Sequence, residues 1–170
     1  MPSDTNSVSS NLLAALKKQG ADYFVSVPCK LLGDFIKELE SDKEITYVPV
    51  NREEEGLGLC TGAYLAGKVP VMVMQNTGVG TLLTSLCSLG LYYRLPITMM
   101  ISHRGSPGEP IGAQVAMGTT VERLLETLNI PTYRYSDPAD VDTISKLVPF
   151  SSVAESPVAA ILDFDFWGER

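Results

Sequence analysis

Residues 47–67 read YVPVNREEEGLGLCTGAYLAG. An apolar β-type segment is followed by three consecutive glutamates, which begin a predicted helix rich in small residues. Asn51 is placed to cap this helix, because a short polar side chain before the first turn accepts hydrogen bonds from free backbone N–H groups. Acidic side chains in the first turn also complement the positive end of the helix dipole. These structural roles account for the glutamates even with all three in solvent, and that alternative stays open at this point.

Helix geometry limits what the three glutamates can do together. Successive residues differ by about 100° in direction, so Glu53, Glu54 and Glu55 point three different ways. At most one of them can reach deep into a cleft.

The same helix carries small residues at intervals of four, three and four. Their side chains align on one face, which allows another backbone to approach closely. The approaching backbone belongs either to the domain's own sheet or to another subunit, and both alternatives remain open. The residues are Gly56, Cys60, Ala63 and Gly67.

On both sides of this stretch, β-type segments alternate with helical ones. Strands that are apolar on both faces and separated by helices indicate a parallel sheet covered on both sides. We therefore predict an α/β fold with a three-layer open sheet, mostly parallel, and a single domain over residues 1–170. Strands are expected within 22–28, 45–50, 69–75, 96–103, 131–136 and 157–167, and helices within 8–20, 31–40, 52–67, 80–94, 120–129 and 140–148.

Charge and composition exclude several classes of partner. The chain has 13 basic and 20 acidic residues, a net charge of −7, which argues against nucleic acid or an anionic membrane as the main partner. A small anionic substrate stays possible, because local charge can oppose net charge. Residues 1–20 have neither the basic start nor the apolar core of a signal peptide, and no window approaches the roughly 20 apolar residues of a membrane span. We predict a cytoplasmic protein.

The three cysteines, Cys29, Cys60 and Cys87, are far apart and form no CxxC pair. Neither a disulfide framework nor a zinc site is indicated. We predict free, buried thiols and no metal site in this chain.

Polar residues follow each of the first four predicted strands. In open α/β sheets ligands bind beyond the carboxyl ends of the strands, so these residues should share one edge. Lys30 follows the first strand, the glutamates the second, QNTGVG at 75–80 the third, and SHRG at 102–105 the fourth.

Each of these residues also has a purely structural alternative. Lys30 could be an ordinary solvated lysine, although a cation in the first turn of a helix opposes the dipole. The glycines of 75–80 could serve a tight turn or bind an anion, and one GxG is a weak signal for the latter. His103 is the only histidine and adjoins Arg104, and the Gly- and Pro-rich segment 104–118 is a candidate mobile cover.

The combination NREEEGLGLCTGAYLAGKVPVMVMQNTGVG at 51–80, followed by LYYRLPITMMISHRG at 91–105, resembles the pyrimidine-binding domain of thiamine diphosphate-dependent decarboxylases. Within that superfamily the chain is most similar to the phosphonopyruvate and sulfopyruvate decarboxylases, from about Leu12 to the final strand. The resemblance implies the alpha subunit of a sulfopyruvate decarboxylase, which forms sulfoacetaldehyde and carbon dioxide in coenzyme M biosynthesis.

The resemblance also implies the catalytic residue. The family's glutamate stands nine residues before the glycine of a GY or GAY stretch, and counting back from Gly62 gives Glu53. Glu54 is the alternative if the register shifts by one. In such enzymes the glutamate hydrogen-bonds N1′ of the aminopyrimidine and favours the imino tautomer that removes the thiazolium C2 proton. The implied cofactor-binding residues are Glu53, Asn76, Thr77 and Gly78.

Family members hold the diphosphate through magnesium with a GDG motif and an asparagine in a second domain. This chain has only GD, at 33–34, too early to be that motif. The resemblance therefore implies half an active site, completed in an oligomer by a beta subunit that carries the diphosphate-binding domain and the magnesium.

The implied substrate is a small anionic 2-oxo acid, whose sulfonate calls for positive groups. The substrate-binding candidates at the predicted edge are Lys30, Gln75, His103 and Arg104. Two alternatives remain: a phosphonopyruvate decarboxylase subunit, or a non-catalytic α/β module that binds a small anion or regulates another subunit.

Overall fold

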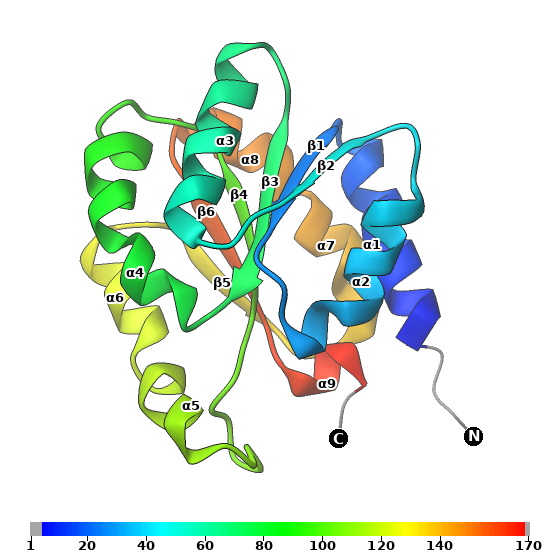
Figure 1. Cartoon of the computed structure of the whole chain (residues 1–170), viewed down its shortest axis with the longest axis vertical. Coiled ribbons are helices and arrows are strands. Elements are labelled where there is room, and N and C mark those ends of the chain that lie inside the picture. The colour runs from blue at the N-terminus through cyan, green and yellow to red at the C-terminus, as the bar shows by residue number, and fades with distance from the viewer. Residues whose placement is uncertain (1–4, 169–170) are drawn as a thin grey trace.

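A computed structural model describes residues 5–168, which form a six-stranded sheet in the order β2-β1-β3-β4-β6-β5 (Figure 1). Every strand pairing in this sheet is parallel. The predicted α/β fold with helices on both faces is confirmed. The strands are β1 Tyr23–Ser26, β2 Thr46–Pro49, β3 Pro70–Gln75, β4 Thr98–Ser102, β5 Thr132–Tyr135 and β6 Val158–Leu162.

Helices cover the two faces of the sheet as two separate layers (Figure 1). One layer holds α1 Thr5–Lys18, α2 Gly33–Ser41, α7 Val141–Ser145 and α8 Leu147–Ala154. The other holds α3 Glu53–Leu65, α4 Gly78–Ser85 with its π-helical continuation η2 Leu86–Leu91, and α6 Val121–Thr127. The remaining elements are η1 Lys30–Leu32, α5 Gly112–Gly118, η3 Pro138–Asp140 and α9 Phe164–Trp167.

The strands feed two hydrophobic cores by simple alternation. In β3, Val71 and Val73 face the core under α1 and α2, while Met72 and Met74 face the core under α3 and α4. Alternate residues of a strand point to opposite faces, so a strand apolar throughout must be covered on both. This double burial fixes the register and aligns the carboxyl ends of the strands along one edge.

The start of α3 differs from the prediction. Its N-cap is Arg52, in extended conformation and without a side-chain cap, and Asn51 is exposed. The predicted Asn51 cap is therefore wrong, because the helix begins one residue later than that cap requires.

The small-residue face of α3 packs on the domain's own sheet. Gly56, Cys60 and Ala63 are buried, and a Cβ added at Gly56 would lie 3.0 Å from the Met72 methyl carbon. Of the two alternatives left open, the sheet is therefore the one realised. Gly67, with φ of +83°, lies beyond the end of the helix.

The thiols are not all buried as predicted. Cys60 is buried, which raises the pKa of its thiol to about 12, and Cys29 is half-buried. The prediction is wrong for Cys87, which is exposed on the outer side of η2. No group of three or more potential metal ligands occurs within residues 5–168, and no helix there is long and apolar enough to cross a membrane.

Candidate functional site

The four predicted loops do meet at the carboxyl edge of the sheet. Figure 1 shows this edge where η1, α9 and α5 lie, together with the start of α3. Side-chain hydrogen bonds link the ends of β1, β3 and β4 there, and another links α3 to α4.

Glu53 is the first residue of α3 and is half-buried. Its carboxyl lies directly against Gly78, where an added Cβ would overlap it. The Thr81 hydroxyl lies 3.3 Å from Oε2 of Glu53 but 2.9 Å from the Gly78 carbonyl oxygen, so one proton serves two acceptors. Within the described part of the chain, this carboxylate receives only that long hydrogen bond.

The neighbouring glutamates point elsewhere, as the helix geometry predicts. Glu54 accepts a hydrogen bond of 2.9 Å from the Arg52 guanidinium, which lowers the pKa of the Glu54 carboxyl. Its other oxygen, Oε2, is buried and has no hydrogen-bond partner among residues 5–168. Glu55 is exposed.

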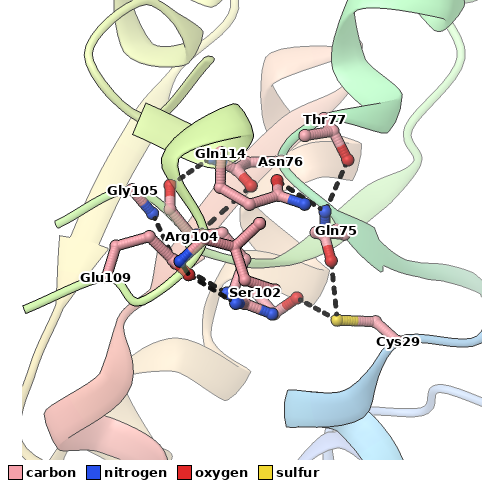
Figure 2. A network of polar contacts seen from close by, with 10 residues as sticks. Cys29, Gln75, Asn76, Thr77, Ser102, Arg104, Gly105, Glu109 and Gln114 are labelled. Atoms are coloured by element: carbon pink, nitrogen blue, oxygen red, sulfur yellow. Dashed lines mark hydrogen bonds and ion pairs between the residues drawn. The ribbon is translucent and has the colours of Figure 1, made fainter. Parts of the chain in front are cut away.

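Gln75, at the end of β3, joins three segments of the edge (Figure 2). Its Oε1 accepts from the Cys29 thiol at 3.1 Å. Its Nε2 donates to Oγ1 of Thr77 at 2.6 Å and to Oε1 of Gln114 on α5 at 3.1 Å. The two donors and the acceptor of this amide are therefore used within the chain.

Asn76 is fully buried and ties the loop after β3 to the loop after β4. Its Nδ2 donates to the Arg104 carbonyl oxygen at 2.8 Å, and its Oδ1 accepts from the Arg104 N–H at 3.2 Å. The Asn76 side chain thus sets the relative position of the two loops.

Arg104 forms a two-pronged ion pair with Glu109 (Figure 2). Its Nε and Nη2 donate to the two carboxylate oxygens at 2.8 and 2.5 Å. Glu109 also accepts from the N–H groups of Gly105 and Ile111, both at 3.0 Å. The side chains of Arg104 and Glu109 are only 8% and 1% exposed, and the hydrogen bond from Arg104 lowers the pKa of Glu109 to about 2.

His103 is buried, and both ring nitrogens have partners. Nε2 lies 3.0 Å from the Gly118 carbonyl oxygen, so this nitrogen carries the proton, and Nδ1 accepts from Ser106 at 3.0 Å. Burial lowers the pKa of the imidazole. Gly105 and Gly118 also touch, since a Cβ at Gly105 would lie 2.9 Å from Cα of Gly118. The predicted cover, 104–118, is thus a closed loop with joined ends, and α5 forms its second half.

An open cavity of about 780 Å³ lies at the same edge. Its cations are Lys30, Arg104 and Arg134, and its carboxylates are Asp163 and Asp165. Of the four predicted substrate-binding residues, Lys30 and Arg104 line this cavity, whereas Gln75 and His103 lie in the surrounding structure. Glu53 is not part of the wall either.

Sequence reasoning missed two residues of this region, Arg134 and Glu109. Arg134 lies in β5 and pairs with Glu122 at 2.6 Å and with Asp163 at 3.6 Å. A charged residue inside a four-residue strand was the available signal for it. Glu109 lies between two prolines in an irregular loop, and no periodicity marks it.

Comparisons with known proteins agree on the type of domain. Residues 6–94 match the family "Thiamine pyrophosphate enzyme, N-terminal TPP binding domain". Sulfopyruvate decarboxylase subunit alpha of Methanococcus maripaludis is 43% identical over 90% of this chain and 92% of its own. The same subunit of Methanocaldococcus jannaschii is 40% identical over 90% of this chain and 91% of its own.

Other relatives are longer than this chain. Phosphonopyruvate decarboxylase of Streptomyces hygroscopicus is 33% identical over 59% of this chain and 25% of its own. The structure of benzoylformate decarboxylase from Polynucleobacter necessarius superimposes with a TM-score of 0.74 and 16% identity, covering 94% of this chain and 30% of that one. A likeness at this identity shows a shared fold.

Proposed function

The chain belongs to the thiamine pyrophosphate enzymes, and from this premise we propose that it is the alpha subunit of a thiamine diphosphate-dependent 2-oxo acid decarboxylase. The proposed substrate is sulfopyruvate, converted to sulfoacetaldehyde and carbon dioxide, because two relatives that match nearly end to end carry that name. The observation that carries the catalytic part is the Glu53 carboxylate, held against Gly78 with one shared hydrogen bond.

The residues at this edge fit the pyrimidine end of the cofactor. A ring nitrogen that shares a proton with the protein needs a carboxylate whose hydrogen-bonding capacity is largely unused. Glu53 meets this need, since the Thr81 proton is shared with the Gly78 carbonyl oxygen. Gly78 supplies the space, because any side chain there would displace the carboxylate.

In this proposal Glu53 accepts the hydrogen bond at N1′ and holds the proton there. Gly78 and Thr81 fix the direction of its carboxylate, and Asn76 and Thr77 hold the loop that carries Gly78 in place. When bound, thiamine diphosphate supplies the electron sink for decarboxylation. Glu54 stays the alternative, and its buried unpartnered oxygen is the observation in its favour.

The substrate is proposed to enter the cavity walled by Lys30 and Arg104. Gln75 and His103 act on it indirectly, by holding the loops that form the walls. Phosphonopyruvate is the second candidate substrate, favoured by the more distant relative of that name. A non-catalytic anion-binding module is disfavoured, because relatives covering 90% of the chain are named decarboxylase subunits.

The two relatives are named "subunit alpha", which supports a partner subunit. We propose that this beta subunit carries the diphosphate-binding domain and the magnesium, and that the cofactor lies between the two chains. The single domain over 1–170 and the cytoplasmic location stay predictions.

The proposed function is tested by co-producing the chain with its beta subunit and supplying thiamine diphosphate and magnesium. Carbon dioxide release is then measured with sulfopyruvate, phosphonopyruvate and pyruvate. We expect the highest kcat/KM for sulfopyruvate. A higher kcat/KM for phosphonopyruvate would make phosphonopyruvate the preferred substrate. The absence of carbon dioxide release from every 2-oxo acid tested would refute the enzyme assignment.

A further inference from the structure

The two arginines of the cavity are already neutralised from within the chain. Both guanidinium donors of Arg104 that face Glu109 are bound to its buried carboxylate. Arg134 lies between Glu122, at 2.6 Å, and Asp163, at 3.6 Å. A charge paired at such distances offers much less net attraction to a further anion than an unpaired one.

Lys30 differs from both arginines. Lys30 is exposed beyond the carboxyl end of β1, where it is the first residue of η1, and it lines the same cavity. No hydrogen bond or ion pair engages its ammonium group anywhere in residues 5–168. Among the three cations of the wall, Lys30 therefore keeps its full charge for a ligand.

Glu109 keeps the charge of Arg104 paired, whereas Lys30 has no such partner among the described residues. Besides the two bonds to Arg104, its carboxylate accepts from the backbone at Gly105 and Ile111, so four donors converge on it. Arg104 also lies over the Phe164 ring, with 5.6 Å between Cζ and the ring centroid, and this contact adds to the restraint on the guanidinium. The guanidinium is therefore fixed as part of the wall.

We propose that Lys30 recognises the distal acid group of the substrate, and that Glu109 is the positioning residue that keeps the charge of Arg104 from doing so. This inference rests on the proposed function, and it concerns the class of 2-oxo acids that carry a second anionic group. Sulfonate and phosphonate share the relevant chemistry.

The proposal predicts an unusual result for Glu109→Gln. The amide still accepts hydrogen bonds but no longer neutralises Arg104, so the cavity gains one positive charge and should bind a dianion more tightly. A purely structural role predicts the reverse, because a loosened loop weakens every ligand.

The experiment uses the assembled complex with beta subunit, thiamine diphosphate and magnesium. Two unreactive probes, sulfoacetate as dianion and acetate as monoanion, are titrated by calorimetry, and KM and kcat for sulfopyruvate are measured alongside. Lys30→Met should weaken sulfoacetate about tenfold or more and acetate less than about twofold. Glu109→Gln should tighten sulfoacetate about threefold or more and lower KM for sulfopyruvate.

Three further variants complete the design. Glu109→Asp keeps the charge and should restore the selectivity of the unmodified chain. Glu40→Gln makes the same change of net charge on the exposed side of α2 and should alter neither probe. The double variant Arg104→Met with Glu109→Gln removes the neutral pair as a whole and should change sulfoacetate binding by less than about threefold, since the net charge of the wall stays the same.

The roles proposed for Lys30 and Glu109 can fail independently of the proposed decarboxylase function. If the double variant weakens sulfoacetate selectively and as much as Lys30→Met does, or if Glu109→Gln weakens it, the inference is wrong. If Glu109→Gln fails to fold, the comparison of Lys30→Met with the double variant, which leaves no unpaired charge behind, still decides. If the unmodified complex releases no carbon dioxide from sulfopyruvate, the proposed function fails, whatever the probe affinities show.

Discussion

Glu53 and Glu54 are neighbours in sequence but occupy different surroundings. Glu53 lies against Gly78 and shares the proton of Thr81, whereas Glu54 turns back to Arg52. A rotation of about 100° between successive helical residues is sufficient to separate the two carboxylates.

For this pair we predict that Glu53→Gln lowers kcat of the assembled enzyme by about 10²- to 10⁴-fold, the usual contribution of a positioned proton-transfer group. Glu54→Gln removes a partly exposed ion pair and should leave kcat near that of the unmodified enzyme. Steady-state kinetics of both variants in the same complex provides the check. An inactive Glu54→Gln together with an active Glu53→Gln would move the catalytic role to Glu54.

Gly78 is the second residue on which the site depends. We predict that Gly78→Ala sharply lowers both activity and thiamine diphosphate affinity in the complex, because the new methyl group occupies the place of the Glu53 carboxyl. Gly62→Ala is the matched control, since nothing lies within 4 Å of a Cβ there and helix propensity favours alanine by about 1 kcal/mol. Calorimetric titration with the cofactor compares the two, and equal affinities would contradict the steric argument.

At the scale of elements, α3 combines the proposed catalytic residue at its start with a packing face. Gly56 brings the helix down onto β1 and β3, where a Cβ would lie 3.0 Å from Met72 and 3.3 Å from Val25. The same close approach holds Glu53 near the sheet edge.

We predict that Gly56→Leu destabilises the isolated chain by about 1–3 kcal/mol or more, as overpacked cores do. The change acts on folding, because this face lies on the chain's own sheet. Thermal unfolding of the chain alone measures it, with Gly58→Ala, which meets nothing within 4 Å, as control. An unaltered melting temperature with loss of subunit association would instead place this face at an interface.

The segment between β4 and α6 is organised by Glu109, and this has a consequence in acid. The pKa of Glu109, lowered to about 2 from an ordinary value of 4.5, means that the folded state holds the ionised form more strongly than the unfolded state does. Its contribution to stability is therefore complete above 4.5 and is lost as pH falls through about 2.

We predict that the stability difference between the unmodified chain and Glu109→Gln shrinks as pH falls from about 5 to about 2.5. Denaturant unfolding at several pH values measures this difference, and the subtraction removes the effect of other titrating groups. A difference that stays constant over this range would show that the Arg104 pair does not contribute through charge.

At the scale of the whole molecule, we expect folding and chemistry to be separable. The sheet is covered on both faces by helices of the same chain (Figure 1), and each face has a core of buried hydrophobic residues. The pyrimidine end of the proposed site lies at one edge of this unit.

We predict that the purified chain folds alone but binds thiamine diphosphate weakly until the beta subunit is added. The chain alone would contact only the pyrimidine end of the cofactor. It would lack the charge-assisted interactions with the diphosphate, which supply much of the affinity. Calorimetry with magnesium present, before and after addition of the partner, tests this. Tight stoichiometric binding by the chain alone, or decarboxylation without a partner, would contradict the shared site.

The sequence by itself determined the architecture and the edge that matters. Alternating strand and helix patterns are local signals that can be read along the sequence. Strands that are apolar throughout indicate a parallel sheet that is buried on both faces. Placing Lys30, Glu53, Gln75 and Arg104 at one edge followed from that topology alone.

Only the tertiary structure decided what each of these side chains does there. The structure begins α3 at Glu53, one residue later than an Asn51 cap predicts, and forms a helix at 112–118 within the segment predicted as a mobile cover. The pairing of Arg104 with Glu109, and of Arg134 with Asp163, joins residues whose approach requires a closed loop or two neighbouring strands. Such pairings leave no periodic trace in a sequence, because they depend on burial and three-dimensional proximity, whereas strands and helices repeat their pattern every few residues.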